Sequence, residues 1–411
     1  MFRFKRMIGI KMKKINVKKM LSPAALRYNA PLIVCIVLVV VLLFIPTGFK
    51  DDDEGGNAVR CVGRVTATDE STVFSQGMIK TGTQICTVTV SDGKYKGETY
   101  KAYNPLQGSL EKDKLFEVGD KAQLVVNYNG DTNKVTYVSM IDHYRVPYEL
   151  VIAGAYVLFL VLFAGKTGLR AIFSFALTIL TIWKMIVPLY LRGIDPVWVS
   201  IGATLFLAVM ILGLVYGFDM RCASAVSGSF LGILVTCVLG ILFTDMFKLN
   251  GATLSYAESI LYTGFGNLDI KSIFTASVFI GSSGAVMDLS VDITSAVHEV
   301  VEKRPDISAL EAIKSGMNVG RAAISTMTTT LLLAYSGGYM GLLMLFMIQS
   351  TPIQHIFNYK YVASEIVQTM IGSFGLVTVA PLTAVCAGIL LTRAKKRQIA
   401  REAANGTPDI I

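Results

Sequence analysis

Long apolar segments alternate with short polar connections over most of this chain, a pattern that predicts membrane-spanning helices. Crossing a hydrocarbon layer of ~30 Å takes about 20 helical residues. Eight apolar segments approach or reach that length, so the sequence predicts a multi-span α-helical membrane protein with about eight transmembrane helices. The expected spans are Leu32–Ile45, Tyr148–Ala164, Ala171–Leu191, Val197–Gly217, Ala223–Phe243, Ser272–Val291, Ile324–Ile348 and Val367–Leu391.

The first apolar run, Leu32–Ile45, resembles the core of a signal peptide, but no small-residue cleavage site follows it. We therefore expect an uncleaved anchor between Pro31 and Pro46. The stretch Met1–Arg27 holds nine Lys and Arg residues, which places the N-terminus in the cytoplasm. An even number of spans then returns the basic RAKKR tail to the same side.

Between the first and second spans, the sequence changes to short runs in which polar and apolar residues alternate or β-branched residues predominate. Turn sequences such as SDGKYKG and NGDTN separate these runs. The pattern predicts a small all-β domain, barrel-like and of OB or SH3-like type, and the topology predicts that it is extracytoplasmic. The expected strands are Val59–Ala67, Gln84–Ser91, Tyr95–Tyr103, Lys121–Tyr128 and Lys134–Ile141.

These patterns give a predicted domain layout along the chain. Ser308-x-x-Glu311 is a capping box, and we expect it to start an amphipathic cytoplasmic helix over about residues 308–320. The predicted segments are a basic cytoplasmic N-terminus (1–30), an anchor (31–49), a linker (50–57), the β domain (58–146), a seven-helix membrane domain (147–392) and a basic cytoplasmic tail (393–411).

Composition supports the membrane assignment. The 411 residues are 53% hydrophobic and 16% charged, and the mean hydropathy is +0.56; a soluble chain is nearer a quarter charged. The net charge of +9 comes from basic clusters at the two ends, beside apolar segments. Such clusters favour anionic lipid headgroups, and the chain lacks the aromatic and basic interleaving of nucleic-acid binders. We expect a lipid bilayer as partner and no nucleic acid.

The six cysteines show no metal-ligand spacing, so neither a metal site nor a cofactor is expected. Cys61 and Cys86 both fall in the predicted β domain. Outside the cell they form a candidate disulfide; the alternative is that both stay reduced.

The stretch Gly281–Glu299, GSSGAVMDLSVDITSAVHE, holds the strongest candidate site. Asp288 and Asp292 are four residues apart and share a helix face. A charge at membrane depth costs at least ~2.5–3.5 kcal/mol on insertion scales, so it is retained mainly for function. His298 is a candidate proton relay. The expected ion or substrate pathway consists of Asp288, Asp292, Ser282, Ser283, Thr326, Thr329 and Thr330.

Two plainer interpretations stand beside this one. Asp292 falls near the cytoplasmic edge of its span, where water can solvate it. Hydroxyls in membrane helices usually bond back to their own backbone, so the threonines of Thr326–Thr330 need not face either aspartate.

The sequences GSSGAVMDLSVDITSAVHEV and SALEAIKSGMNVGRAAISTMTTTL resemble the YibE/F-like family of bacterial membrane proteins. The resemblance covers about residues 30 to 392 and includes the outer β domain. GAVMDLSVD is also distantly similar to the aspartate-bearing helix of resistance-nodulation-division and SecD/SecF-type proteins, although here the acids are four residues apart and no large porter domain is present. These resemblances imply transport, with Asp288 and Asp292 exchanging protons or cations.

The sequence leaves three classes of function to compare. The first is an ion- or proton-coupled transporter or export accessory in the bacterial plasma membrane, acting on an unidentified small solute or ion. The alternative is a non-transporting membrane protein whose β domain binds a partner, peptide or envelope component. An enzyme is not expected, because HExxH, GxSxG and P-loop motifs are absent and the three histidines are scattered. Small-residue motifs such as GSFLG at Gly228–Gly232 also allow a homo-oligomer.

Overall fold

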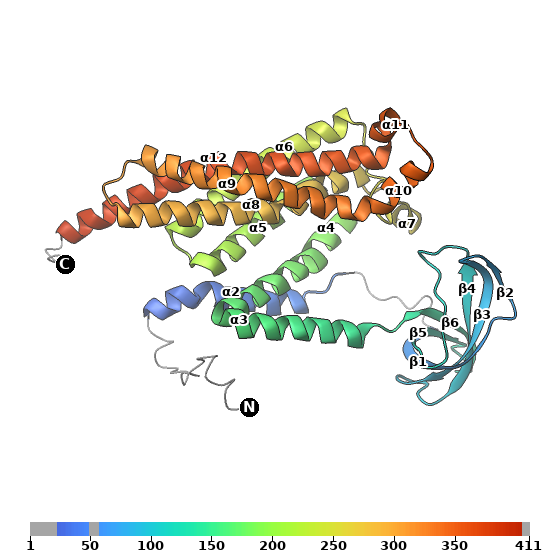
Figure 1. Ribbon diagram of the computed structural model, residues 1–411. Helices are drawn as coiled ribbons and strands as arrows, with labels where there is room; N and C mark the ends of the chain where they lie inside the picture. The colour runs from blue at the N-terminus through green and yellow to red at the C-terminus, as the bar shows by residue number, and fades with distance from the viewer. Residues whose placement is uncertain (1–22, 49–56, 405–411) are drawn as a thin grey trace, which may run out of the picture. The chain divides into compact units, whose positions relative to one another are not determined.

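The computed structural model describes residues 23–48 and 57–404 (Figure 1). The predicted basic N-terminal segment up to residue 22, most of the predicted acidic linker (residues 50–56) and the last seven residues of the basic tail lie outside that part. The chain divides into two compact units, which are considered separately below. One contains residues Gly48–Phe163, and the other combines Met1–Thr47 with Ala164–Ile411.

The first unit contains a β-barrel. Strand β1 pairs with both β5 and β3, which closes five strands in the order β1-β5-β6-β4-β3, and β2 is added to β3 outside the ring. All pairings are antiparallel except a single parallel pair, Tyr103 with Ser139, between β4 and β6. The strands are β1 Ala58–Asp69, β2 Val73–Gln76, β3 Ile79–Val90, β4 Thr99–Gln107, β5 Lys121–Tyr128 and β6 Val135–His143.

Alternation of inward and outward side chains builds the barrel. In β5, Ala122, Leu124 and Val126 are fully buried while their neighbours are less so, as the two-residue period of a strand requires. Two polar side chains, Gln84 and Asn104, are buried in this core, and Asn104 Nδ2 donates to Gln84 Oε1 at 3.1 Å. The Gln84 amide exchanges hydrogen bonds with the backbone of Phe116, donating to the carbonyl at 2.8 Å and accepting from the N–H at 3.0 Å.

The five expected strands are present, with changes at their ends. β5 has the expected bounds, whereas β3 begins at Ile79, five residues before its expected start. The short strand β2 was not predicted. It forms a hairpin with β3 that turns at Gly77, where a positive φ of 64° suits glycine. The fourth strand begins at Thr99 because the preceding turn extends through Gly97, which also has a positive φ.

Of the two alternatives for Cys61 and Cys86, a disulfide or two reduced thiols, the structure has the reduced thiols. Both thiols are free and buried. The β1–β3 register pairs Cys86 with Thr68, seven residues along β1 from Cys61. Seven residues of strand extend about 20 Å, far beyond the Cα separation that a disulfide bridges. Burial raises the pKa of each thiol to about 11.

The second unit is helical. Helix α3 is shared between the two units, and its residue Gly165 has non-helical angles that break it. The helices are α2 Pro23–Phe44, α3 Val146–Thr181, η3 Ile182–Ile186, α4 Val187–Leu191, α5 Pro196–Tyr216, α6 Met220–Met246, α7 Ala257–Tyr262, α8 Ile270–Lys303, α9 Ala309–Ser336, η4 Gly337–Tyr339, α10 Met340–Ile348, α11 Ile353–Asn358 and α12 Lys360–Ala404.

Six helical segments of the described chain are long and apolar enough to cross a membrane, against about eight expected. The difference has two sources. Val146–Leu191 counts once, although two spans were expected within it. The apolar part of α2, Asn29–Phe44, falls short of a full span, and Pro31 lies inside that helix, not at its start.

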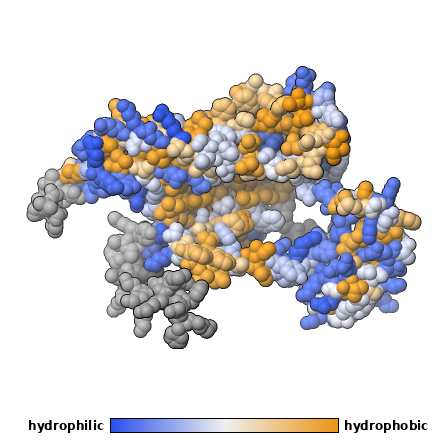
Figure 2. Space-filling view, viewed as in Figure 1, coloured by the Kyte–Doolittle hydropathy of each residue, from blue (hydrophilic) through white to orange (hydrophobic). Residues whose placement is uncertain are grey.

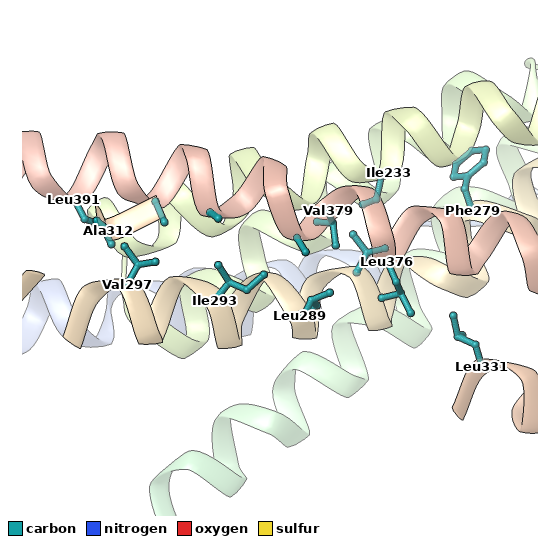
Figure 3. Packing of buried hydrophobic residues seen from close by; sticks show 14 of the residues in the cluster. Ile233, Phe279, Leu289, Ile293, Val297, Ala312, Leu331, Leu376, Val379 and Leu391 are labelled. Atoms are coloured by element: carbon teal, nitrogen blue, oxygen red, sulfur yellow. The ribbon is translucent and has the colours of Figure 1, made fainter. Parts of the chain in front are cut away.

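Helices α6, α8, α9 and α12 run side by side and form the core of the bundle (Figure 1). Leu289, Ile293 and Val297 of α8 point toward α12 (Figure 3). Small residues bring the backbones together: a Cβ on Gly320 of α9 would come within 2.9 Å of Ala380 in α12. The bundle is therefore closely packed along its centre.

The predicted amphipathic helix over about residues 308–320 forms the first part of α9. Its capping box is present, because Ser308 and Glu311 bond reciprocally. The helix, however, continues without a break from Ala309 to Ser336 into the expected seventh span, which is itself interrupted at Gly337–Tyr339. Its first half packs through Gly316 against Val297 of α8, so this segment belongs to the bundle and is not a separate surface helix.

Surface chemistry varies along the bundle. Figure 2 shows hydrophobic residues over much of the visible side of the bundle and hydrophilic residues gathered where α8 passes into α9. That connection contains the ion pairs Lys303–Glu299 and Arg304–Asp306. The bundle thus has an apolar body and at least one strongly polar end.

Candidate functional site

Helix α8 has two faces of different chemistry. Its buried face holds Leu289, Ile293 and Val297, all packed toward α12 (Figure 3). Spacings of three and four residues place a second set of side chains together on the opposite face, because an α-helix turns once every 3.6 residues. This polar stripe of α8 consists of the exposed residues Gly281, Gly284, Asp288, Asp292, Ser295 and Glu299.

Asp288 and Asp292 lie in the middle of the polar stripe. Their Cβ atoms are neighbours at roughly 5–6 Å, as for any pair one helical turn apart. Among the described residues, neither carboxylate has a hydrogen-bond or ion-pair partner. Two like charges this close repel each other, and a proton or cation bound to either one relieves that repulsion. The arrangement is therefore suited to reversible binding of a positive charge.

Tyr216, at the end of α5, borders the polar stripe. Its hydroxyl donates to the carbonyl oxygen of Val291 at 2.7 Å and lies 2.7 Å from Ser295 Oγ, which donates in turn. The guanidinium of Arg221 lies 5.4 Å from the centre of the tyrosine ring and pairs with Asp219 across 2.6 Å. Polar groups of α5 and α6 thus meet α8 about one turn beyond Asp292.

His298 lies further along α8, about 15 Å along the helix axis from Asp288. It opens on a pocket of about 310 Å³ where α6 begins and the last turns of α8 and α12 meet. Glu302 and Lys395 form an ion pair of 2.7 Å at this pocket. The structure therefore groups His298 with charged residues at the end of the bundle. The pocket is lined by Asp219, Met220, Arg221, His298, Val301, Glu302, Leu391, Ala394, Lys395 and Gln398.

The predicted hydroxyl residues do not gather around the aspartates. Ser282 and Ser283 are buried, on the face of α8 opposite the polar stripe, and bond to carbonyls of the preceding turn. Thr326, Thr329 and Thr330 are exposed, and each donates to a carbonyl three or four residues earlier in α9. A hydroxyl in a helix satisfies its donor most directly in this way. In the described chain, no hydrogen bond joins them to Asp288 or Asp292.

Glu365 in α12 was not among the predicted site residues. Its Oε1 accepts a hydrogen bond from Thr369 Oγ1 at 3.4 Å, and the hydroxyl of Tyr339 also interacts with the carboxylate. Its Oε2 is buried without a hydrogen-bond partner. The available signal was an acidic residue two positions before the expected span Val367–Leu391. The helix in fact begins seven residues before that span, at Lys360, which brings Glu365 into the bundle.

Metal binding finds no support in the described residues: no group of three or more His, Cys, Asp or Glu side chains gathers closely enough to hold an ion. Asp288 and Asp292 supply only two ligand side chains. A bound proton or a weakly held cation suits them better than a resident metal.

Comparison with known proteins identifies one family. Residues 152–393, from within α3 to α12, match the family described as YibE/F-like protein. The match covers more than half of the 411 residues, includes the polar stripe of α8 and Glu365, and leaves out the barrel. The matched range is shorter than the range of about residues 30 to 392 over which the sequence resembles this family. None of the curated proteins and none of the solved structures compared matches the chain.

Proposed function

This chain belongs to the YibE/F-like family, and from that premise we propose that it is an ion- or proton-coupled membrane transporter or an export accessory protein. Asp288 and Asp292 carry the proton or cation in this proposal. The observation that supports it is the pair of unpartnered carboxylates on the polar stripe of α8, a helix whose opposite face is packed into the bundle core. The proposal includes no enzymatic activity.

The position of the pair along α8 fits a carrier at the edge of the hydrocarbon layer. Asp288 is 18 residues from the start of the helix at Ile270, or about 27 Å at 1.5 Å per residue. Asp292 follows at about 33 Å, and the hydrocarbon layer is ~30 Å thick. Asp288 is thus the more deeply placed carboxylate and Asp292 the more readily hydrated one.

The same proposal places the protein in the bacterial plasma membrane with both termini in the cytoplasm. The basic clusters at both ends support this orientation. Val146–Leu191 has 46 residues, which is about 69 Å of helix and long enough for two crossings. Its helix breaks at Gly165. Two crossings there, together with α2, give eight and put the barrel outside the cytoplasm. The basic termini would bind anionic lipids. A homo-oligomer and the distant likeness to resistance-nodulation-division proteins stay predictions.

Proteoliposomes containing the full chain test the carrier role. An imposed pH gradient with an interior pH dye measures proton flux, and the same vesicles with sodium or potassium ions measure coupled cation movement. Asp288→Asn together with Asp292→Asn should reduce flux at least tenfold while insertion is retained. Asp306→Asn is the matched control, because this exposed carboxylate pairs only with Arg304 in the loop before α9. Wild-type flux in the double variant would eliminate Asp288 and Asp292 as carriers.

A second candidate function rests on the barrel. Phe74, Met78 and Leu110 are 74%, 83% and 66% exposed, which is unusual for large apolar side chains on a small domain. Met78 and Leu110 border the same shallow groove between the β2–β3 hairpin and the segment after β4. The barrel's strand order, with its one parallel pair, is that of the OB type, which often serves binding. A partner, peptide or envelope component would bind there in a non-transporting membrane protein.

Substituting the apolar groove separates the two candidates. Met78→Ser with Leu110→Ser should leave proteoliposome flux unchanged if the protein is a transporter. If partner binding is its function, the same variant should lose association with isolated envelope fractions, and the Asp288→Asn and Asp292→Asn variant should keep it. Loss of flux in the groove variant with retained insertion would contradict a carrier confined to the bundle.

A further inference from the structure

We propose that Glu365 is a second proton-binding site of the bundle, located at the opposite end from the His298 pocket. Its carboxylate lies in the second turn of α12. Helices α8 and α12 run parallel, since Ser290 bonds to Thr383 and Glu302 pairs with Lys395 further along both helices. Glu365 is 30 residues before Lys395 on α12, about 45 Å of helix.

The surroundings of Glu365 favour the protonated carboxyl. Oε2 is sealed from solvent and has no donor, and the neighbouring Ala363 and Val367 belong to an apolar cluster with Phe274 and Val278. A carboxylate oxygen that is buried without a donor loses its hydration and gains no hydrogen bond at that oxygen, and this cost disfavours the charged form. A proton on the carboxyl removes most of this cost.

The groups that face Glu365 are uncharged. Thr369 comes from the same helix, Tyr339 from η4 and Tyr335 from α9. In the described chain, no Lys or Arg side chain compensates its charge, in contrast to the ion pairs at the other end of the bundle. A hydroxyl can donate a hydrogen bond to the ionised carboxylate and accept one from the protonated carboxyl. These neighbours can therefore hydrogen-bond to Glu365 in either protonation state. These hydroxyls allow the carboxyl to take up and release a proton, while the buried Oε2 favours the protonated form.

Tyr335 connects this end of the bundle to the polar stripe of α8. Its hydroxyl lies so close to Gly281 that a Cβ on that glycine would come within 2.6 Å of it. Gly281 is seven residues, about 10 Å, from Asp288. The tyrosine hydroxyl therefore adjoins the first residue of the polar stripe, and the ring is near enough to Glu365 to be influenced by its charge. Tyr335 is the residue through which we expect a proton from Glu365 to move toward Asp288.

Carbodiimide labelling of the purified full chain in lipid nanodiscs tests proton binding directly. Dicyclohexylcarbodiimide adds to a protonated carboxyl, whose proton passes to a nitrogen of the reagent, and the adduct rearranges to a stable N-acylurea carrying the whole reagent mass. The tryptic peptide Tyr361–Arg393 contains Glu365 as its only acidic side chain, so an adduct on it reports this residue. The peptide Leu249–Lys271, which holds Glu258 and Asp269, is the reference for ionised carboxylates.

We expect the Glu365 peptide to be labelled at least tenfold faster than the reference peptide at pH 7, with a rate that falls as the pH rises. Glu365→Gln should abolish the adduct, and Glu111→Gln, at an exposed site in the barrel unit, should leave it unchanged. Thermal unfolding of both variants checks that they fold, and Glu365→Asp should retain labelling if the glutamine variant does not fold. Equal labelling of the two peptides would overturn the proposal.

The role of Glu365 in transport rests on the proposed function, whereas its proton binding does not. Proteoliposome flux therefore serves as a separate measurement. Labelling at Glu365 without any proton flux in the wild-type protein would overturn the transporter and keep the proton site. Flux that persists in Glu365→Gln would remove this residue from the pathway, even if Asp288 proves essential.

Discussion

Gly228 of α6 is where the bundle has least room for a side chain. A Cβ at this position would come within 2.6 Å of Thr383 Cα in α12 as well as against its side chain. Because one of the two groups is backbone, a rotamer change cannot relieve the overlap, and the helices must move apart. Thr383 also shares a hydrogen bond of 3.1 Å with Ser290 of α8, so the displacement extends to the helix that holds the polar stripe.

The expected cost of Gly228→Ala follows from these contacts. Overpacking a close-packed interior costs about 1–3 kcal/mol, and loss of the Ser290–Thr383 hydrogen bond adds about 0.5–1.5 kcal/mol. Alanine's better helix propensity offsets ~0.5–1 kcal/mol. The net destabilisation is then about 1–3 kcal/mol, or roughly a tenfold to hundredfold change in the unfolding equilibrium.

Unfolding of the full chain in mixed micelles with rising SDS, followed by circular dichroism, measures this difference. Gly202→Ala in α5 is the matched control, because a Cβ there meets no atom within 4 Å. The control should be as stable as the wild type or up to ~1 kcal/mol more stable. If Gly228→Ala and Gly202→Ala unfold at the same SDS fraction, the close approach of α6 and α12 does not stabilise the bundle.

Two predictions concern the barrel. Burial raises the pKa of the Cys86 thiol to about 11. At pH 8 a maleimide should therefore modify Cys86 slowly in the native protein and rapidly after unfolding in SDS. Equal rates would show that solvent reaches Cys86 in the native barrel. Backbone N–H groups of Gln107 and Ser109 hold the pKa of Asp113 below its ordinary value. The stability it contributes should be full above pH ~4 and lost as the pH falls through the lower folded-state pKa. Asp113→Asn should flatten that acid transition in near-UV circular dichroism, and an unchanged transition would contradict the role of Asp113.

Local patterns in the sequence predicted local structure well. The alternation in Lys121–Tyr128 fixed the bounds of β5, and the Ser308–Glu311 capping box located the start of α9. Both depend on neighbours within a few residues, through side-chain period or a reciprocal hydrogen bond. The apolar segments likewise indicated most of the helices of the bundle, because hydropathy over 18 or more residues is itself a local property.

Predictions that depended on distant residues did less well. Cys61 and Cys86 were paired by domain, but strand register decides separation, and register follows from which residues of two strands bury together. The sequence left two interpretations of the α9 threonines open, a pathway with the aspartates or hydrogen bonds to their own backbone, and the structure has the backbone bonds. The sequence predicted an amphipathic helix before the seventh span, but not that Gly316 and Gly320 would pack it against α8 and α12.

The sequence by itself determined that the chain carries apolar helices, a β domain and a pair of acids one turn apart on α8. It could place Asp288 and Asp292 on one face because helix periodicity is fixed by backbone geometry. Only the tertiary structure decided that this face is the unpacked one, since burial depends on α6, α9 and α12 covering the other side. It also decided that Oε2 of Glu365 is buried without a hydrogen-bond partner, because a side chain's solvation depends on neighbours far away in sequence.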